Sequence, residues 1–226
     1  MRWRHSPAEQ DLFNIAQPPS PEHPLGTDEL GRDLLARVLY GGRVSLVVGI
    51  LASLIATAIG VAVGAAAGYY GGILDNLLMR PGDLPLAVPS IFLLLILFSL
   101  IRPSLNAVIF FLAAFGWLYL ARVVRGEFLA LREKEFIESS RALGAGNMRL
   151  IFKHLLPNVI GSIIVATTLE VGFFMLAEGT LSFLGYGVPA STPSWGNMLN
   201  AAQSYYMQAP LMTIIPGLAL PLPVLS

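Results

Sequence analysis

The chain has 226 residues with no net formal charge, and 55% of them are hydrophobic while only 12% are charged. Soluble domains carry about 25% charged residues, so this composition is typical of an integral membrane protein. Because the net charge is zero, the chain has no overall positive electrostatic field that would attract nucleic acid. The lack of cysteine excludes disulfides, thiol nucleophiles and thiolate metal sites. Neither lysine, Lys134 or Lys153, belongs to a phosphate-binding loop G-x-x-x-x-G-K-[ST], so we do not expect this chain to bind ATP itself.

The first 43 residues are predicted to form an extracytoplasmic segment, followed by a transmembrane domain over residues 44–226. The segment has no apolar core of the signal-peptide kind. Near its end, apolar residues recur at helical spacing, with Thr27 or Asp28 available as the N-cap. These apolar positions are Leu30, Leu34, Leu35 and Val38. The pattern predicts an amphipathic helix that lies along the membrane surface.

Five apolar stretches are candidate membrane spans, and they run over residues 44–68, 84–101, 105–124, 159–184 and 211–225. The first is uncharged and long enough to cross a hydrocarbon core of about 30 Å. The second contains Pro85 and follows Pro81, so we expect its beginning to be kinked or broken. The fifth is short and proline-rich and looks incomplete. The Gly60 to Gly64 spacing allows close helix approach but is common by chance, so we assign it no function.

Positive charge sets the orientation. Residues 121–156 hold half of the chain's 14 Lys and Arg residues, whereas residues 185–210 hold no charged residue. The positive-inside rule therefore places 121–156 in the cytoplasm and 185–210 outside. Counting spans outward puts the first 43 residues on the external side. With five spans, the N-terminal segment would have to cross the membrane without a preceding span. We therefore expect a further apolar span upstream of Met1.

The most informative pattern is a cytoplasmic sequence with fixed spacing. It consists of Glu138-Ser139-Ser140, three residues, Gly144, ten residues, and Leu155-Leu156-Pro157. Physically, this predicts a short helix, a glycine with positive φ, a second short helix, and a proline in the first turn of the next span. On spacing alone, a connecting loop and a docking surface are equally good interpretations.

Residues 135–157, EFIESSRALGAGNMRLIFKHLLP, resemble the EAA loop of ABC-type importer permeases. Three further segments resemble the dipeptide, oligopeptide and nickel permease branch of that family: HPLGTDELGRDLLARVLYGGRVSL at 23–46, GYYGGILDNLLMR at 68–80 and LSFLGYGVPASTPSWGNML at 181–199. The similarity covers nearly everything from His23 to Leu220. It implies an all-α integral membrane protein with a type I ABC importer transmembrane domain, in which the family's first span is missing and the last is clipped.

The resemblance also implies roles and partners. Residues 121–157 would be the coupling loop that docks on an ATPase, with Ser139 and Ser140 replacing the motif's two alanines. The implied docking residues are Glu138, Ser139, Ser140, Gly144, Leu155 and Pro157. The implied partners are two ATPase subunits that carry ATP and Mg²⁺, a second homologous permease, and an extracytoplasmic solute-binding protein. The chain itself would need no cofactor, and its location would be the prokaryotic inner membrane.

The resemblance favours di- or oligopeptides as the solute, with nickel or another small solute as the alternative.

Glu170 and Glu178 are the only carboxylates in the fourth span, and they lie about 80° apart around a helix of 3.6 residues per turn. Buried charge is costly in a membrane, so both are candidate pathway residues. The alternative is a hydrogen-bonded structural glutamate near the interface, above all for Glu178.

A protein of another class, a secondary transporter or channel with these two acids as a proton or cation relay, stays open. So does a remnant without transport activity. The aromatic side chains of Trp117, Tyr119 and Trp195 are interpreted as anchors in the membrane interface, where aromatic belts lie, and not as groups that stack on a substrate.

Overall fold

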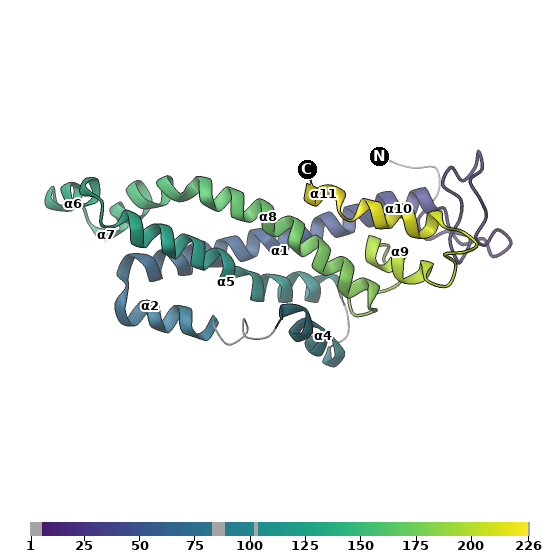
Figure 1. The fold of residues 1–226 in the computed structure, drawn as a ribbon, viewed down its shortest axis with the longest axis horizontal. Helices are drawn as coiled ribbons and strands as arrows, with labels where there is room; N and C mark the ends of the chain where they lie inside the picture. Colours follow the sequence, from purple (N-terminus) through teal and green to yellow (C-terminus); the bar gives the residue numbers. More distant parts are fainter. Residues whose placement is uncertain (1–5, 83–88, 102–103, 226) are drawn as a thin grey trace. The chain divides into compact units, whose positions relative to one another are not determined.

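The computed structural model describes residues 6–82, 89–101 and 104–225, and every regular element in this part of the chain is a helix (Figure 1). Three helical runs are long and apolar enough to cross a membrane. They are α1 (Leu34–Tyr70), α5 (Leu105–Leu131) and the run Asn147–Phe183, which includes α8 (Leu156–Phe183). These contain the first, third and fourth predicted spans, so the expected all-α membrane architecture is confirmed.

The second predicted span is described only in part. Its described helix, α4 (Ser90–Leu100), is too short to cross a bilayer by itself. Before it come α2 (Gly72–Met79) and a 3₁₀ turn (Arg80–Gly82), which contains Pro81. Pro85, where we expected a kink, lies outside the described residues.

The fifth predicted span is not one helix. It forms α10 (Leu211–Ala219) and α11 (Leu222–Leu225), with a break at Pro221 between them. Proline cannot donate a backbone hydrogen bond, and this accounts for the interruption.

The amphipathic surface helix expected in the head is not a separate element. Leu34, Leu35 and Val38 instead lie in the first turns of α1, which continues without a break to Tyr70. The sequence over this range contains no proline, so nothing interrupts the helix. Its N-cap is neither Thr27 nor Asp28: the Asp33 carboxylate accepts a 2.7 Å hydrogen bond from the backbone N–H of Ala36.

A cluster of buried charged side chains pairs within itself around the beginning of α1. The Asp28 carboxylate accepts hydrogen bonds from Arg32 Nε at 2.6 Å and lies 3.1 Å from Arg37 Nε. Arg32 also donates to the Glu29 carboxylate, and His23 Nδ1 lies 2.9 Å from Asp33 Oδ1. Asp28, Arg32 and Arg37 are all buried, so the segment that begins α1 is a folded, charge-balanced structure.

Contacts divide the chain into two compact units. Unit 1 comprises Met1–Ile50, Leu94–Ile109 and Val171–Ser226, and unit 2 comprises Leu51–Leu93 and Phe110–Glu170. Both α1 and α8 pass from one unit into the other. The predicted boundary between an extracytoplasmic segment (1–43) and a transmembrane domain (44–226) falls inside α1, which continues without interruption through residue 43. Where the chain enters the membrane stays a prediction.

In unit 1, Trp195 opens α9 (Trp195–Ala202) and packs on the beginning of α1. Its side chain is buried, and its Nε1 donates a 3.0 Å hydrogen bond to the Val38 carbonyl. A side chain on Gly42 would collide with the indole, at 2.6 Å from Cζ2. The prediction that Trp195 anchors the chain at the membrane interface is therefore wrong: its indole is a packing element.

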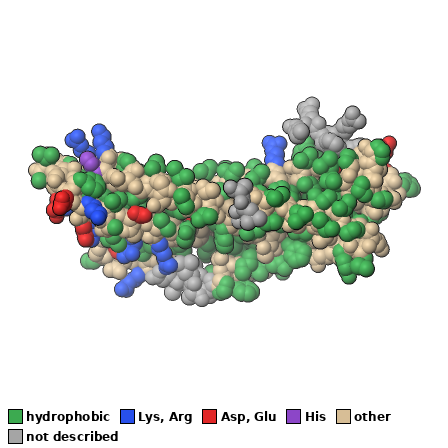
Figure 2. All heavy atoms as spheres, turned by 45° about the horizontal axis from the view of Figure 1, so that its top comes forward, with side chains coloured by type: hydrophobic (Ala, Val, Ile, Leu, Met, Phe, Trp, Pro, Cys, Tyr) green, Lys and Arg blue, Asp and Glu red, His purple; other side chains and the backbone are tan. Residues whose placement is uncertain are grey.

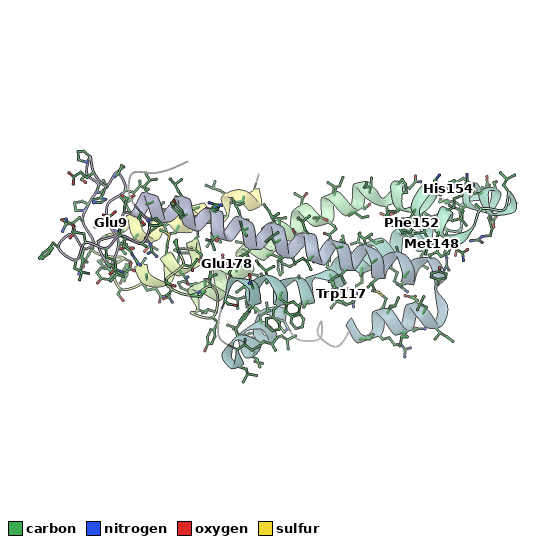
Figure 3. All side chains as sticks on the ribbon, turned by 180° about the vertical axis from the view of Figure 1, so that it is seen from behind. Glu9, Trp117, Met148, Phe152, His154 and Glu178 are labelled. Atoms are coloured by element: carbon green, nitrogen blue, oxygen red, sulfur yellow. The ribbon has the colours of Figure 1, made fainter. Side chains whose placement is uncertain are left out.

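In unit 2, α1 and α5 approach each other backbone to backbone along a row of glycines. A Cβ built on Gly60 would lie 2.8 Å from the Trp117 carbonyl oxygen, and one on Gly68 would lie 2.8 Å from that of Arg125. Between them, a Cβ built on Gly64 would collide with the Ala121 carbonyl oxygen. Figure 3 shows Trp117 on α5 beside α1. The Gly60 to Gly64 spacing, to which we assigned no function, thus belongs to a helix-packing interface of the small-xxx-small kind.

The same unit has a core that joins the predicted coupling loop to the long apolar helices. Ile137 of α6 (Glu135–Ala142) is fully buried in it, as is Phe128 of α5. Tyr69, at the end of α1, donates its hydroxyl to Asn147 Oδ1 at 2.8 Å. These contacts fix the loop on the helices that carry it.

Candidate functional site

The first half of the predicted coupling loop has the conformation expected from its sequence. Helix α6 ends at Ala142, Leu143 is its C-cap, and Gly144 follows with φ of 85°. The Gly144 N–H donates to the Arg141 carbonyl at 2.9 Å, and the Ala145 N–H donates to the Ser140 carbonyl at 3.1 Å. This pair of hydrogen bonds is a Schellman motif, in which a left-handed residue closes the helix. The prediction of a short helix ended by a glycine with positive φ is confirmed.

The second half differs from the prediction of a separate short helix. Helix α7 (Asn147–Arg149), a π-helix (Leu150–Leu155) and α8 form one continuous run. Pro157 therefore lies inside a helix and not in its first turn.

The π-helix explains how a proline fits there. Proline lacks an N–H, and its ring crowds the carbonyl four residues before it. The wider turns of a π-helix relieve such crowding. The Asn158 side chain also donates a 2.6 Å hydrogen bond to the His154 carbonyl in this stretch.

The structure divides the predicted docking residues into exposed and buried sets. Exposed are Glu138, Ser139, Gly144 and Pro157. Ser140 is half-buried and donates its hydroxyl to the Phe136 carbonyl at 2.8 Å, while Leu155 is fully buried. Leu155 thus belongs to the core that carries the loop and not to its surface.

Sequence reasoning missed Leu143, which is 89% exposed directly before Gly144. An apolar side chain at the end of a helix normally lies on the buried face. Leu143 is six residues from the buried Ile137, hence about 120° away around the helix. This angle, which places Leu143 away from the buried face of the helix, is the sequence feature that could have revealed its exposure. A nearly fully exposed leucine beside the helix end is a candidate anchor for a partner surface.

Figure 2 shows acidic, basic and histidine side chains gathered over the end of unit 2 that carries α6 and α7. Helix α6 begins with two acidic residues and ends with Arg141, so its charges complement the helix dipole. Met148, Phe152 and His154 lie together near this end (Figure 3). The loop therefore presents mixed charge around exposed apolar side chains, a composition suited to protein docking.

Glu178 occupies a satisfied polar cluster in unit 1. Its side chain is fully buried, and its two carboxylate oxygens accept hydrogen bonds from the Ser45 hydroxyl at 2.8 Å and the Ser182 hydroxyl at 2.7 Å. Ser182 Oγ also accepts from the Val188 N–H at 3.2 Å. The cluster ties α1 to α8 and to the loop that follows it. This geometry favours the structural alternative for Glu178, while a pathway role stays a prediction.

Glu170 has a different environment, in unit 2. It is 5% exposed, and neither carboxylate oxygen has a hydrogen-bond partner among the described residues. An unpartnered buried acid is costly and therefore needs a functional or protonation-based explanation. Glu170 remains the stronger of the two predicted pathway candidates.

A third acid, Glu127, was not predicted. The third span was expected to end at residue 124, which left Glu127 in the loop, but α5 continues to Leu131. Glu127 Oε1 accepts a 2.9 Å hydrogen bond from the Ser162 hydroxyl of α8. The two residues line a cavity of about 410 Å³ between α5 and α8. The signal was the continued helical pattern through residue 131.

Arg125 of α5 and Arg132, directly after its end, have structural roles in unit 2. Arg125 donates from Nε and Nη2 to Asp75 of α2 at 2.5 and 2.6 Å, and these hydrogen bonds lower the pKa of the Asp75 carboxyl. Arg132 Nη1 donates to the Gly68 carbonyl at 3.2 Å. Among the described residues, no group of three or more His, Asp or Glu side chains is placed to hold a metal ion.

Comparison with known sequences gives concordant relatives. The profile described as "Binding-protein-dependent transport system inner membrane component" matches residues 60–222. The chain is 40% identical over 206 residues to the oligopeptide transport system permease protein OppC of Bacillus subtilis, covering 90% of this chain and 68% of OppC. It is 41% identical over 219 residues to the dipeptide transport system permease protein DppC of Alkalihalophilus pseudofirmus, covering 97% and 72%.

A third relative is the glutathione transport system permease protein GsiD of Escherichia coli, 40% identical over 216 residues. That alignment covers 96% of this chain and 71% of GsiD. Among solved structures, a chain from the inward-facing MetNI methionine ABC transporter superposes with a TM-score of 0.69 at 21% identity, covering 85% of this chain and 91% of that one. This likeness establishes the fold.

Proposed function

Because this chain belongs to the inner membrane components of binding-protein-dependent transport systems, we propose that it forms the translocation pathway of an ATP-driven importer of di- or oligopeptides. Three relatives at about 40% identity carry the names of oligopeptide, dipeptide and glutathione permeases. Glutathione is itself a small peptide, so the three names agree on the chemical class of the solute. Nickel or another small solute is the alternative.

The observation that carries the proposal is the exposed loop built around Gly144. Its helix α6 is held by Ile137 in the unit-2 core, while Glu138, Ser139 and Leu143 remain exposed. The second half of the loop continues without a break into α8. A loop that is held on one side and exposed on the other can pass a force from a partner into a membrane helix.

The proposed partners are two ATPase subunits, a second permease subunit and an extracytoplasmic solute-binding protein. ATP and Mg²⁺ would bind on the ATPases. Closure of the ATPases on ATP would move the two coupling loops and favour one access state of the permease pair over the other. Such coupling requires that the ATPases interact differently with the two states.

The orientation follows from the charge asymmetry and can be tested in a chain without native cysteine. We expect a cysteine at Glu133 to face the cytoplasm and one at Ser191 to face outside. Both positions are exposed, and the Glu133 side chain is 77% accessible. In intact cells, a membrane-impermeant maleimide should label position 191 and should label position 133 only after permeabilisation. Labelling of position 133 in intact cells would contradict the orientation.

The function is tested by uptake in reconstituted vesicles. The complete complex with its binding protein should accumulate a labelled di- or tripeptide only when ATP and Mg²⁺ are on the ATPase side. Unlabelled peptide should compete, and nickel ions should not. Accumulation of nickel but not of peptide would transfer the chain to the alternative solute class. Accumulation driven by a proton gradient without ATP would favour the relay interpretation, in which Glu170 is the central residue.

A further inference from the structure

The cavity between α5 and α8 lies entirely within unit 2 and is mainly apolar. On α5, Tyr119, Val123 and Glu127 follow one another at intervals of four residues, so they form one stripe. The facing wall comes from α8, which contributes Gly161, Ser162, Val165, Ala166 and Leu169. A cavity of about 410 Å³ falls within the range of about 300–1,000 Å³ that is typical of small-molecule sites. A dipeptide fits such a volume.

Glu127 is the charged residue among the described residues that line this cavity. The Ser162 hydroxyl donates to its Oε1, and this is its only hydrogen bond or ion pair to other described residues. The lining residues that the structure describes include no arginine or lysine. The Glu127 side chain is half-buried and lines the cavity, and its second carboxylate oxygen keeps its capacity to accept a hydrogen bond from a ligand.

The α8 wall of the cavity leaves room at Gly161. Gly161 has nothing within 4 Å of the position where a Cβ would lie. The Tyr119 ring, 53% exposed, stands two helical turns from Glu127 on α5. An aromatic face at one end and a carboxylate at the other suit a molecule with an ammonium group at one end and an apolar body.

We propose that this cavity binds the primary ammonium group of the transported solute, with Glu127 as its charge partner and Ser162 as the residue that positions Glu127. The inference rests on the proposed function, because the amino terminus of a peptide is such a group. Glu127 lies on the same end of α5 as the coupling loop, so the site would be occupied on the cytoplasmic side before release. A single charge partner keeps the site weak enough for the solute to leave.

The test uses cysteines in the otherwise cysteine-free chain within the assembled complex. Val165→Cys places a thiol in the cavity wall, and Ile164→Cys places one at the next position of α8 outside the cavity. The two parent side chains are 61% and 59% exposed, so the sites are matched. Methanethiosulfonate reagents with an ammonium, a neutral or a sulfonate group are applied in inside-out vesicles.

We expect the rate ratio of the ammonium to the neutral reagent to be about three- to tenfold higher at position 165 than at position 164. Adding Glu127→Gln should lower the ratio at 165 to that at 164. Ser162→Ala should lower it in part, because Glu127 then loses its fixed orientation. Glu133→Gln, which removes an exposed carboxylate from the loop, should leave the ratio unchanged. An equal ratio at both positions, no reaction at 165, or no response to Glu127→Gln would overturn the proposal.

Protection identifies the ligand. Dialanine added on the cytoplasmic side should slow modification of position 165, and N-acetyl-dialanine should not. Equal protection by both peptides would overturn the role of the ammonium group. If the complex takes up peptide normally but the ammonium reagent is not preferred at position 165, this inference is wrong and the proposed function stands. If the ammonium reagent is preferred at position 165 but the complex neither takes up peptide nor is protected by it, the assignment of peptides as the solute is wrong instead.

Discussion

Replacing Gly144 with valine should abolish solute uptake and weaken association with the ATPase while leaving membrane insertion intact. Gly144 has φ of 85°, a conformation that costs a β-branched residue about 1–3 kcal/mol. Nothing lies within 4 Å of the position where its Cβ would be, so the penalty comes from the backbone and not from a collision. Relief of that strain would undo the Schellman motif that ends α6. Glu138 and Leu143 would then face the partner at a wrong angle.

Gly146 provides a matched control two residues away. It too has open space around its Cβ position, but its φ of −72° is accessible to valine. Gly146→Val should therefore retain most of the uptake and ATPase binding. Gly144→Asn should be milder than Gly144→Val, because asparagine tolerates the left-handed region.

Co-purification of the ATPase and uptake by the complete complex measure these effects. Equal behaviour of the two valine variants would show that backbone strain at Gly144 does not set the coupling geometry. If the chain works as a channel or secondary transporter, Gly144→Val should be nearly silent and Glu170→Gln should be damaging.

Replacing Gly64 with valine should destabilise unit 2 by forcing α1 away from α5. Its Cβ would meet the Ala121 carbonyl oxygen, with Ala121 Cα and Val124 Cβ each 3.0 Å away. These are atoms of a packed helix that cannot move without separating α1 from α5. Overpacking of this kind costs about 1–3 kcal/mol and occasionally more. A loss of about 2–3 kcal/mol corresponds to a melting temperature lower by roughly 4–12 °C.

Gly126 on α5 is the control for the change in residue type. It is also a helical glycine, but nothing lies within 4 Å of its Cβ position, so Gly126→Val alters helix propensity without creating a collision. Thermal unfolding of the purified complex in detergent compares the two variants. A Gly64→Val protein that melts with the Gly126→Val protein would contradict the close approach of α1 and α5.

The features that were predicted from sequence depend on neighbouring residues. Gly144 is followed and preceded by helix-forming segments, so a left-handed helix end could be inferred from the chain alone. The first, third and fourth spans were equally local, because apolar length decides them. Their ends were less predictable. Helix α5 continues past the expected end at residue 124 to Leu131, and its Arg125 pairs with Asp75, fifty residues earlier in the chain.

The features that were missed depend on pairs of residues far apart in sequence. Ser45 and Glu178 form a hydrogen bond across a separation of 133 residues, and no local pattern in either helix announces it. The row of Gly60 and Gly64 gains meaning only when α5 lies against it. Trp195 has the composition of an interfacial anchor, and only its contact with the Val38 carbonyl reveals a packing role.

Between Leu150 and Leu155 the helical run that leads into α8 takes five-residue hydrogen-bond steps in place of four. Relative to an uninterrupted α-helix, this amounts to one additional residue, or a phase advance of about 100° around the axis. The direction in which Leu143 and α6 point is thereby set partly by a residue count and not only by side-chain chemistry. Deleting one residue from this stretch would leave the composition of the loop and of the span almost unchanged. It would nevertheless swing the loop by about a quarter turn, so the spacing between Gly144 and Pro157 encodes an angle.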